Sequence, residues 1–253
     1  MLFDPGKESF HGIHRGRHFG DEFKILGVIF DTQLGMHAAA REIAREAGWR
    51  LKTLLRCRRY YTTPDLVKLY KAQILSYIES GTPALHHAAP SVLDCVDRVQ
   101  RRFLREVGLS EERVLTEYRL APLCARRDIA MIGMLHRITS GTAPPELAKL
   151  FVPVNRTTGF GTRNLEVRHE RQLREFVSGG GHTETCRRSA FGLVTVWNML
   201  PGDVVMSKST KVVQRRLQDA LRNHMESGQR NWQTLFANSA RRMTPVRFQS
   251  LFV

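Results

Sequence analysis

The sequence predicts a mainly α-helical protein, a bundle of helices with a short N-terminal β-strand or hairpin and a less regular C-terminal part. Apolar residues recur at helical spacing from residue 36 to about residue 140. A single run, residues 23–31, has the aliphatic and aromatic composition of a strand. Residues 152–189 are rich in glycine and poor in aliphatic side chains, which predicts a long loop or linker.

The N-terminal elements follow from this pattern. Residues 1–22 have glycines but no apolar period, so we expect a loop before the strand. The first long helix should span residues 36–60, because its apolar residues fall within about one third of the helical wheel. That core-facing stripe consists of Ala40, Ile43, Ala44, Ala47, Leu51, Leu54 and Leu55.

Capping signals predict where the next helices begin. Thr63 followed by Pro64 is typical of a helix start, and the helix should end near Gly81. Ser91 and Asp94 have the spacing of a capping box, which predicts a helix from residue 91 to Gly108. Shorter helices are expected at residues 111–117, 122–140 and 144–151.

The chain therefore divides into four predicted parts. Residues 1–35 hold the loop and the strand, residues 36–151 form a helical domain, residues 152–189 form the linker, and residues 190–253 form a C-terminal helical part. Within the last part only residues 212–225 have clear helical periodicity, so the tail carries no prediction.

The charge points to a polyanionic partner. The 253 residues include 39 Lys and Arg against 24 Asp and Glu, a net charge of +15, and 31 of the 39 cations are arginines. Guanidinium groups bind phosphate oxygens in pairs, so nucleic acid is the first partner to consider. By itself this composition fits an anionic membrane or a GC-rich genome equally well. With 42% hydrophobic residues, a wholly disordered chain is excluded.

Targeting and redox signals predict an intracellular protein. No apolar run approaches the roughly 18 to 20 residues of a membrane span, and the first residues lack the pattern of a signal peptide. Cys57, Cys95, Cys124 and Cys186 form no C-x-x-C pair, so we expect reduced, mostly buried thiols. A nuclear or cytoplasmic location is expected, without secretion and without a membrane partner.

Motifs for self-sufficient catalysis are absent from the sequence. No Asp-Asp pair is present, and there is no phosphate-binding P-loop, G-x-S-x-G or H-E-x-x-H motif. Asp94 and Asp97 precede Arg98, which predicts ion pairs on a solvated face. His86 and His87 have no further ligand at metal-binding spacing. We therefore predict no catalytic, metal-binding or cofactor-binding residue.

Two rows of cations are the candidate nucleic-acid-binding residues. The first row lies within an arc of about 60° on the helix 36–60 and extends about 27 Å. It consists of Arg41, Arg45, Lys52, Arg56 and Arg59. On the helix 91–107 the second row consists of Arg98, Arg101, Arg102 and Arg105. A solvated face usually mixes charge signs, so two nearly uncompensated rows favour phosphate binding over a plain solvent surface.

Six short motifs resemble, in order, the reverse transcriptases of non-LTR (LINE-type) retrotransposons. The run KILGVIFD at 24–31 resembles their "k-x-LGv-x-x-D" strand, and LYKA at 69–72 with IESGTP at 78–83 resembles "lYKa…i-x-YG-x-p". The other four are VQRRFLR at 99–105, LAPL at 120–123 with Arg126 and Arg127, PPEL at 144–147, and Arg188 with WNMLP at 197–201.

The resemblance implies the end of the polymerase palm in residues 1–35, a helical thumb in residues 36–151 and a connector in residues 190–253. A thumb binds the template and primer, so RNA, DNA or an RNA:DNA duplex is the implied partner, with the palm and fingers as a possible second one. The family's F/Y-x-D-D turn and earlier palm aspartate have no match here, so this chain alone should lack RNA-directed DNA polymerase activity. Mg²⁺ is expected only for a full-length polymerase.

Two alternatives remain open at this point. The chain could be a stand-alone helical nucleic-acid-binding protein that uses the same basic helices without polymerase ancestry. It could also be an inert remnant of a retroelement.

Overall fold

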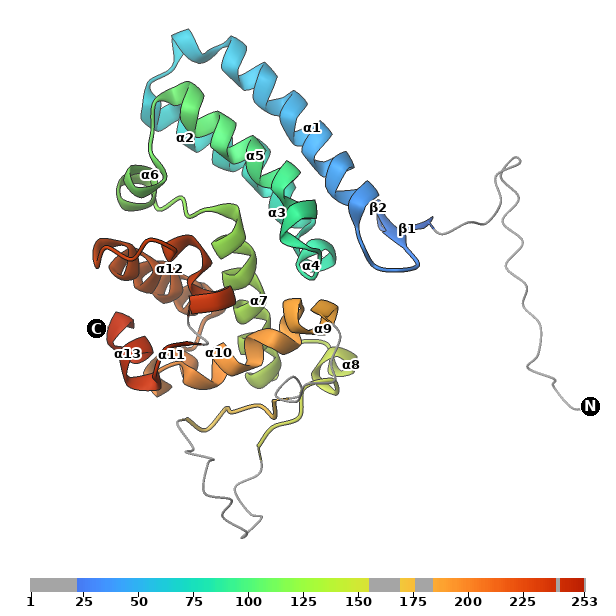
Figure 1. Cartoon of the computed structure of the whole chain (residues 1–253), viewed down its shortest axis with the longest axis vertical. Coiled ribbons are helices and arrows are strands. Elements are labelled where there is room, and N and C mark those ends of the chain that lie inside the picture. The colour runs from blue at the N-terminus through green and yellow to red at the C-terminus, as the bar shows by residue number, and fades with distance from the viewer. Residues whose placement is uncertain (1–21, 155–168, 176–183, 240–241, 253) are drawn as a thin grey trace, which may run out of the picture.

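The computed structural model describes residues 22–154, 169–175, 184–239 and 242–252. Its only sheet in these residues is a two-stranded antiparallel hairpin, and the other regular elements are helices, which confirms the predicted mainly α fold. The helices form two lobes that meet along one central helix, α7 (Leu123–Thr139) (Figure 1). Residues 1–21 and most of the predicted linker lie outside the described residues.

The predicted strand 23–31 is a hairpin. Strand β1 (Glu22–Ile25) pairs with β2 (Val28–Asp31) through a two-residue turn at Leu26 and Gly27. Both turn residues have positive φ, 48° and 86°, which is the conformation that two-residue hairpin turns favour. The carboxylate of Asp31 then accepts the backbone N–H groups of Gln33, Gly35 and Met36 and directs the chain into the first helix.

Helix α1 (His37–Arg56) is shorter than predicted. It ends at Arg56, and residues Arg58–Tyr60 form a separate 3₁₀ turn, η1. Its core stripe is as predicted: Ala40, Ile43, Ala47, Leu51 and Leu54 are buried, and Ala44 and Leu55 are partly buried.

The second helical stretch is a chain of short elements. Helix α2 (Thr63–Tyr70) continues through a π turn, η2 (Lys71–Leu75), into α3 (Ser76–Ser80), and α4 (Thr82–Leu85) follows. Helix α5 (Pro90–Val107) begins one residue before the predicted capping box, with Pro90 in its first turn. Ser91 is therefore inside the helix, and Asp94 binds arginines instead of capping it.

The N-terminal lobe consists of β1 to α5. Helices α1 and α5 run side by side in the same direction, and α2 and α3 return between them (Figure 1). The centre of this lobe is the stacked pair Tyr70 and Phe103, whose ring centroids lie 4.2 Å apart in full burial. The stack holds α2 against α5.

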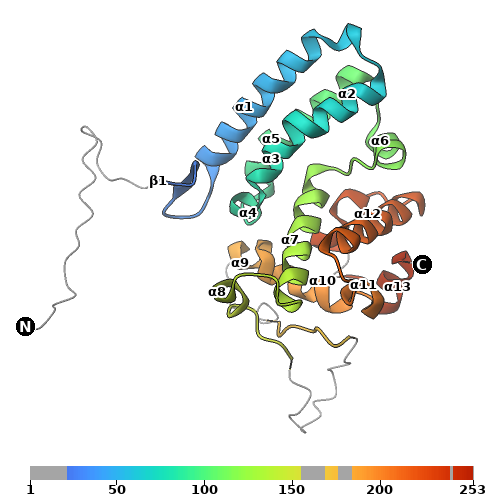
Figure 2. The ribbon, with the colours of Figure 1, turned by 180° about the vertical axis from the view of Figure 1, so that it is seen from behind.

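Helix α7 belongs with the C-terminal residues, although the sequence placed it in the same domain as residues 36–107. Its buried side chains share one core with α10 (Val194–Met199), α11 (Gly202–Val205) and α12 (Thr210–Glu226). Contact with α12 is so close that a Cβ on Gly133 would lie 2.6 Å from Nε2 of Gln214. Figure 2 shows α7 between the two lobes. The preceding helix, α6 (Glu111–Tyr118), contributes side chains to both cores.

Parts of the predicted linker are built into this core. Leu173 is buried and forms an isolated bridge with Pro153, and Asn198 binds both backbone groups of Leu173, donating at 2.8 Å and accepting at 2.9 Å. Trp197 donates to the carbonyl of Arg171. The end of the predicted linker holds a helix, α9 (Glu184–Arg188).

The tail, for which the sequence makes no prediction, completes the C-terminal lobe. The short helix α8 (Pro145–Ala148) and the turn η3 (Ala190–Leu193) flank α7 and α10. Beyond α12 come η4 (Trp232–Thr234), η5 (Leu235–Ser239), α13 (Pro245–Gln249) and η7 (Ser250–Phe252). Trp232, Phe236 and Phe248 are buried in the core.

Candidate nucleic-acid interface

Four of the five cations in the first predicted row lie on α1 and are exposed to solvent: Arg41, Arg45, Lys52 and Arg56. Arg59 departs from the row, because the helix ends before it. It lies in η1 with its guanidinium 4.7 Å from the ring centroid of Tyr60 and donates to the Tyr60 hydroxyl at 2.6 Å.

The cations of α1 differ in how they are paired. Arg45 donates two hydrogen bonds to the carboxylate of Glu42, at 2.7 and 3.1 Å, and these bonds lower the pKa of Glu42. Both groups are exposed, and such surface pairs are worth only about 0 to 1 kcal/mol, so a phosphate could compete for Arg45. Within the described part of the chain, Arg41, Lys52 and Arg56 form no ion pair.

Two other cations of residues 36–60 are tied to the fold. Arg50 pairs with Glu46, donates to the carbonyl of Gln73 and lies 4.1 Å from the ring centroid of Tyr77. Arg58 donates to Glu106 of α5 at 2.7 Å and so joins the ends of α1 and α5. These two side chains hold helices together and are poor candidates for ligand binding.

Sequence reasoning missed an aromatic side chain within this basic face. Trp49 is 66% exposed, and it lies four residues after Arg45 and three before Lys52, so all three side chains share one side of α1. Beside it, Gly48 leaves open space, since a Cβ there would have no neighbour within 4 Å. A shallow hollow of about 520 Å³ results, lined by Arg45, Glu46, Gly48, Trp49 and Lys52. Helical spacing alone could have placed Trp49 next to the basic row.

The second row, on α5, is half neutralised. Arg98 and Arg101 both bind the carboxylate of Asp94, at 3.2 and 2.5 Å, as the predicted solvated ion pairs. The hydrogen bond from Arg101 lowers the pKa of Asp94. Arg102 and Arg105 are exposed and form no ion pair with any residue that the structure describes. The free cations of α5 therefore lie toward its C-terminal end, beside the end of α1.

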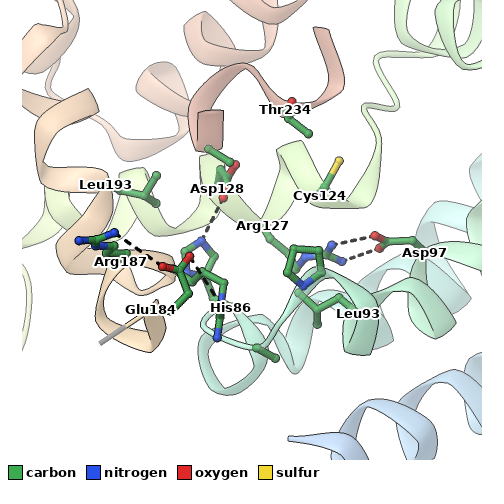
Figure 3. A pocket seen from close by; sticks show the side chains of 14 residues that line it. His86, Leu93, Asp97, Cys124, Arg127, Asp128, Glu184, Arg187, Leu193 and Thr234 are labelled. Carbon is green, nitrogen blue, oxygen red and sulfur yellow. Dashed lines mark hydrogen bonds and ion pairs between the residues drawn. The ribbon is translucent and has the colours of Figure 1, made fainter. Parts of the chain in front are cut away.

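Asp97 does not belong to this solvated face, contrary to the sequence prediction. It turns to the other side of α5 and binds Arg127 of α7 with two hydrogen bonds of 2.6 and 2.9 Å. The pair lies on a pocket between the lobes, with a volume of about 270 Å³ (Figure 3).

The inter-lobe pocket is lined by cations that already face carboxylates. His86 binds Asp128 at 3.0 Å, and Arg187 and Arg188 lie 3.9 and 3.8 Å from the carboxylate of Glu184 (Figure 3). This balance of charge is typical of a joint between two lobes and offers no excess positive charge for an anion.

Neither the histidines nor the cysteines form a reactive centre in the described residues. His86 and His87 face different partners, since His87 bonds with the carbonyl of Leu34. Burial raises the pKa of Cys124 to about 12, so its thiol stays protonated and unreactive. All four cysteines are free, and Cys57 is exposed, unlike the mostly buried thiols that we expected. No group of three or more potential metal ligands occurs within the described ranges.

Membrane insertion finds no support among the described helices, none of which has both the length and the apolar character of a membrane span. Comparison of the chain with protein-family models, with curated proteins and with solved structures gives no match in any of the three.

Proposed function

We propose that this chain binds nucleic acid through the outward faces of α1 and α5, as the thumb and connector part of a reverse transcriptase of the non-LTR retrotransposon type. The observation that carries the proposal is the row of exposed cations on α1, of which Arg41, Lys52 and Arg56 have no ion-pair partner in the described residues. Unpaired guanidinium and ammonium groups at helical spacing suit a phosphate backbone, because each contact releases counterions.

The assignment to this polymerase family rests on the six ordered sequence motifs. Several of their residues have framework roles here: Arg126 pairs with Glu79 at 2.5 Å, and Trp197 and Asn198 hold the segment around Leu173. We propose no polymerase chemistry for this chain alone, since its sequence has no Asp-Asp pair to hold catalytic metal ions.

The binding test removes four cations of α1 together. Replacing Arg41, Arg45, Lys52 and Arg56 by Gln should weaken binding to a labelled duplex, measured by fluorescence anisotropy over a range of salt concentrations. Each lost phosphate contact should reduce the slope of log K against log salt by about 0.9 on B-form DNA.

A matched variant separates this face from net charge. The control replaces four exposed cations of the other lobe by Gln: Lys149, Lys208, Lys211 and Arg215. It loses the same charge and should keep most of the affinity and slope. If the α1 variant keeps the wild-type slope, or if both variants lose it equally, the α1 face is not the binding surface.

The polymerase part has its own test. The chain with an RNA template, a DNA primer and Mg²⁺ should incorporate no nucleotides above background, and incorporation would contradict the proposed lack of an active site. An open reading frame for an Asp-Asp-bearing palm directly upstream in the gene would support the retroelement origin. A stand-alone nucleic-acid-binding protein would bind through the same face without such a neighbour, and an inert remnant would not bind.

A further inference from the structure

We infer that Trp49 is a stacking platform for an unpaired nucleobase, so that the basic face of α1 takes single-stranded RNA or DNA. This inference rests on the proposed function and specifies its ligand. It starts from the contrast among the three tryptophans: Trp197 and Trp232 are 0% and 4% exposed in the core, whereas Trp49 is 66% exposed on the middle of α1.

The exposure of Trp49 has no explanation in the packing of the N-terminal lobe. Its neighbours on the helix surface are cations: Arg45 lies four residues before it, and Lys52 and Arg56 lie three and seven residues after it. An aromatic ring with positive groups on several sides matches the chemistry of a nucleotide, which has a planar base beside a negative phosphate. A protein partner would have to be strongly acidic to cover the same surface.

The space beside the ring is open. Gly48 has no side chain, and the hollow between Arg45, Trp49 and Lys52 has a volume of about 520 Å³. Small-molecule sites have volumes of about 300 to 1,000 Å³, so a single base fits this range. Arg45 and Lys52 at the rim are positioned to bind the phosphates on either side of that base.

More aromatic surface continues along the same end of the lobe. Tyr60 and Tyr61, just after α1, are 70% and 47% exposed, and Arg59 lies against the Tyr60 ring. From residue 49 to residue 56 the helix rises about 10 Å, so the aromatic groups flank a stretch that carries Lys52 and Arg56. Alternating aromatic and cationic groups are typical of surfaces that follow a single strand.

Single strands suit this surface better than a duplex because stacking requires an exposed base. In a duplex the faces of the bases are covered by their neighbours, and only the phosphates would reach the cations of α1. Trp49 would then contribute little.

The indole itself reports the test, because the other two tryptophans are buried. Adding a 12-nucleotide oligo(dT) to the whole chain should quench the tryptophan fluorescence, and adding a 12-base-pair duplex at equal saturation should quench it much less. Trp49→Ala should lower the affinity for oligo(dT) about 10-fold, the range of one lost base stack, and Trp49→Phe should keep most of it. The duplex affinity of Trp49→Ala should change less than 2-fold.

The control is Val246→Ala, which truncates a side chain that is 79% exposed on α13 of the other lobe and should change neither affinity. Wild-type affinity of Trp49→Ala for oligo(dT), or equal losses on oligo(dT) and duplex, would overturn the inference and leave the proposed function standing. A dimer that Trp49→Ala abolishes, with unchanged nucleic-acid binding, would also overturn it. If the wild-type chain binds neither ligand, the proposed function itself fails.

Discussion

Asp97 of α5 and Arg127 of α7 form a two-point ion pair, with Oδ1 accepting from Nη1 at 2.6 Å and Oδ2 accepting from Nη2 at 2.9 Å. The Arg127 side chain is only 9% exposed. Its partner comes from the other lobe, 30 residues earlier in the chain. The pair therefore fixes α7, whose apolar side belongs to the C-terminal core, against the N-terminal lobe.

Loss of the Asp97 carboxylate should destabilise the protein strongly. Asp97→Ala leaves the Arg127 guanidinium buried without a counter-charge, which costs about 3 to 5 kcal/mol of unfolding free energy. Urea unfolding followed by circular dichroism measures the change. Asp94→Ala is the matched control on the same helix, because its pairs with Arg98 and Arg101 are exposed and should contribute at most about 1 kcal/mol. Similar losses for the two variants would show that burial of Arg127 does not set the cost.

Asn198 should control the packing of residues 169–175. Asn198→Ala removes both hydrogen bonds to buried Leu173, leaving its N–H and C=O unpaired, at a cost of about 2 to 3 kcal/mol. Asn198→Asp can still accept from the Leu173 N–H but cannot donate to its carbonyl, so its loss should be intermediate. Amide hydrogen exchange of Leu173 should accelerate in the order wild type, Asp variant, Ala variant. Unchanged exchange in the Ala variant would contradict this role.

The C-terminal lobe should lose stability in mild acid. Burial lowers the pKa of His136 and of His224 below the ordinary 6.5. His136 lies between the Ser207 carbonyl and the Thr210 hydroxyl, at 2.9 and 3.0 Å, and its neutral ring can donate to the first and accept from the second. Below about pH 6.5 the unfolded chain therefore binds protons that the folded chain excludes, and the free energy of unfolding falls as the pH drops.

Denaturation between pH 7.5 and pH 5 measures this effect. The slope should reach at most about 1.4 kcal/mol per pH unit for each histidine. A variant with Gln at positions 136 and 224 should have a flatter profile, whatever its stability at pH 7.5. Burial also lowers the pKa of His87, so some slope should remain. An equally steep profile in the double variant would assign the acid sensitivity to other groups.

Local spacing explains why part of the interface could be predicted from the sequence. The wheel of α1 places its apolar stripe and its cations on different sides, because both depend only on the 3.6-residue period. The same period places Trp49 beside Arg45 and Lys52. It does not say whether a neighbouring helix covers that indole, and the structure leaves it 66% exposed.

The sequence by itself determined the mainly α class, the buried stripe of α1 and the exposed row of cations, since helical periodicity and charge are local properties of the chain. Only the tertiary structure decided that Asp97 pairs with Arg127, that α7 shares its core with α12, and that Trp232 and Phe248 of the tail are buried. These features depend on contacts between residues that are distant in sequence, and neither propensity nor spacing encodes which distant partner a side chain will meet.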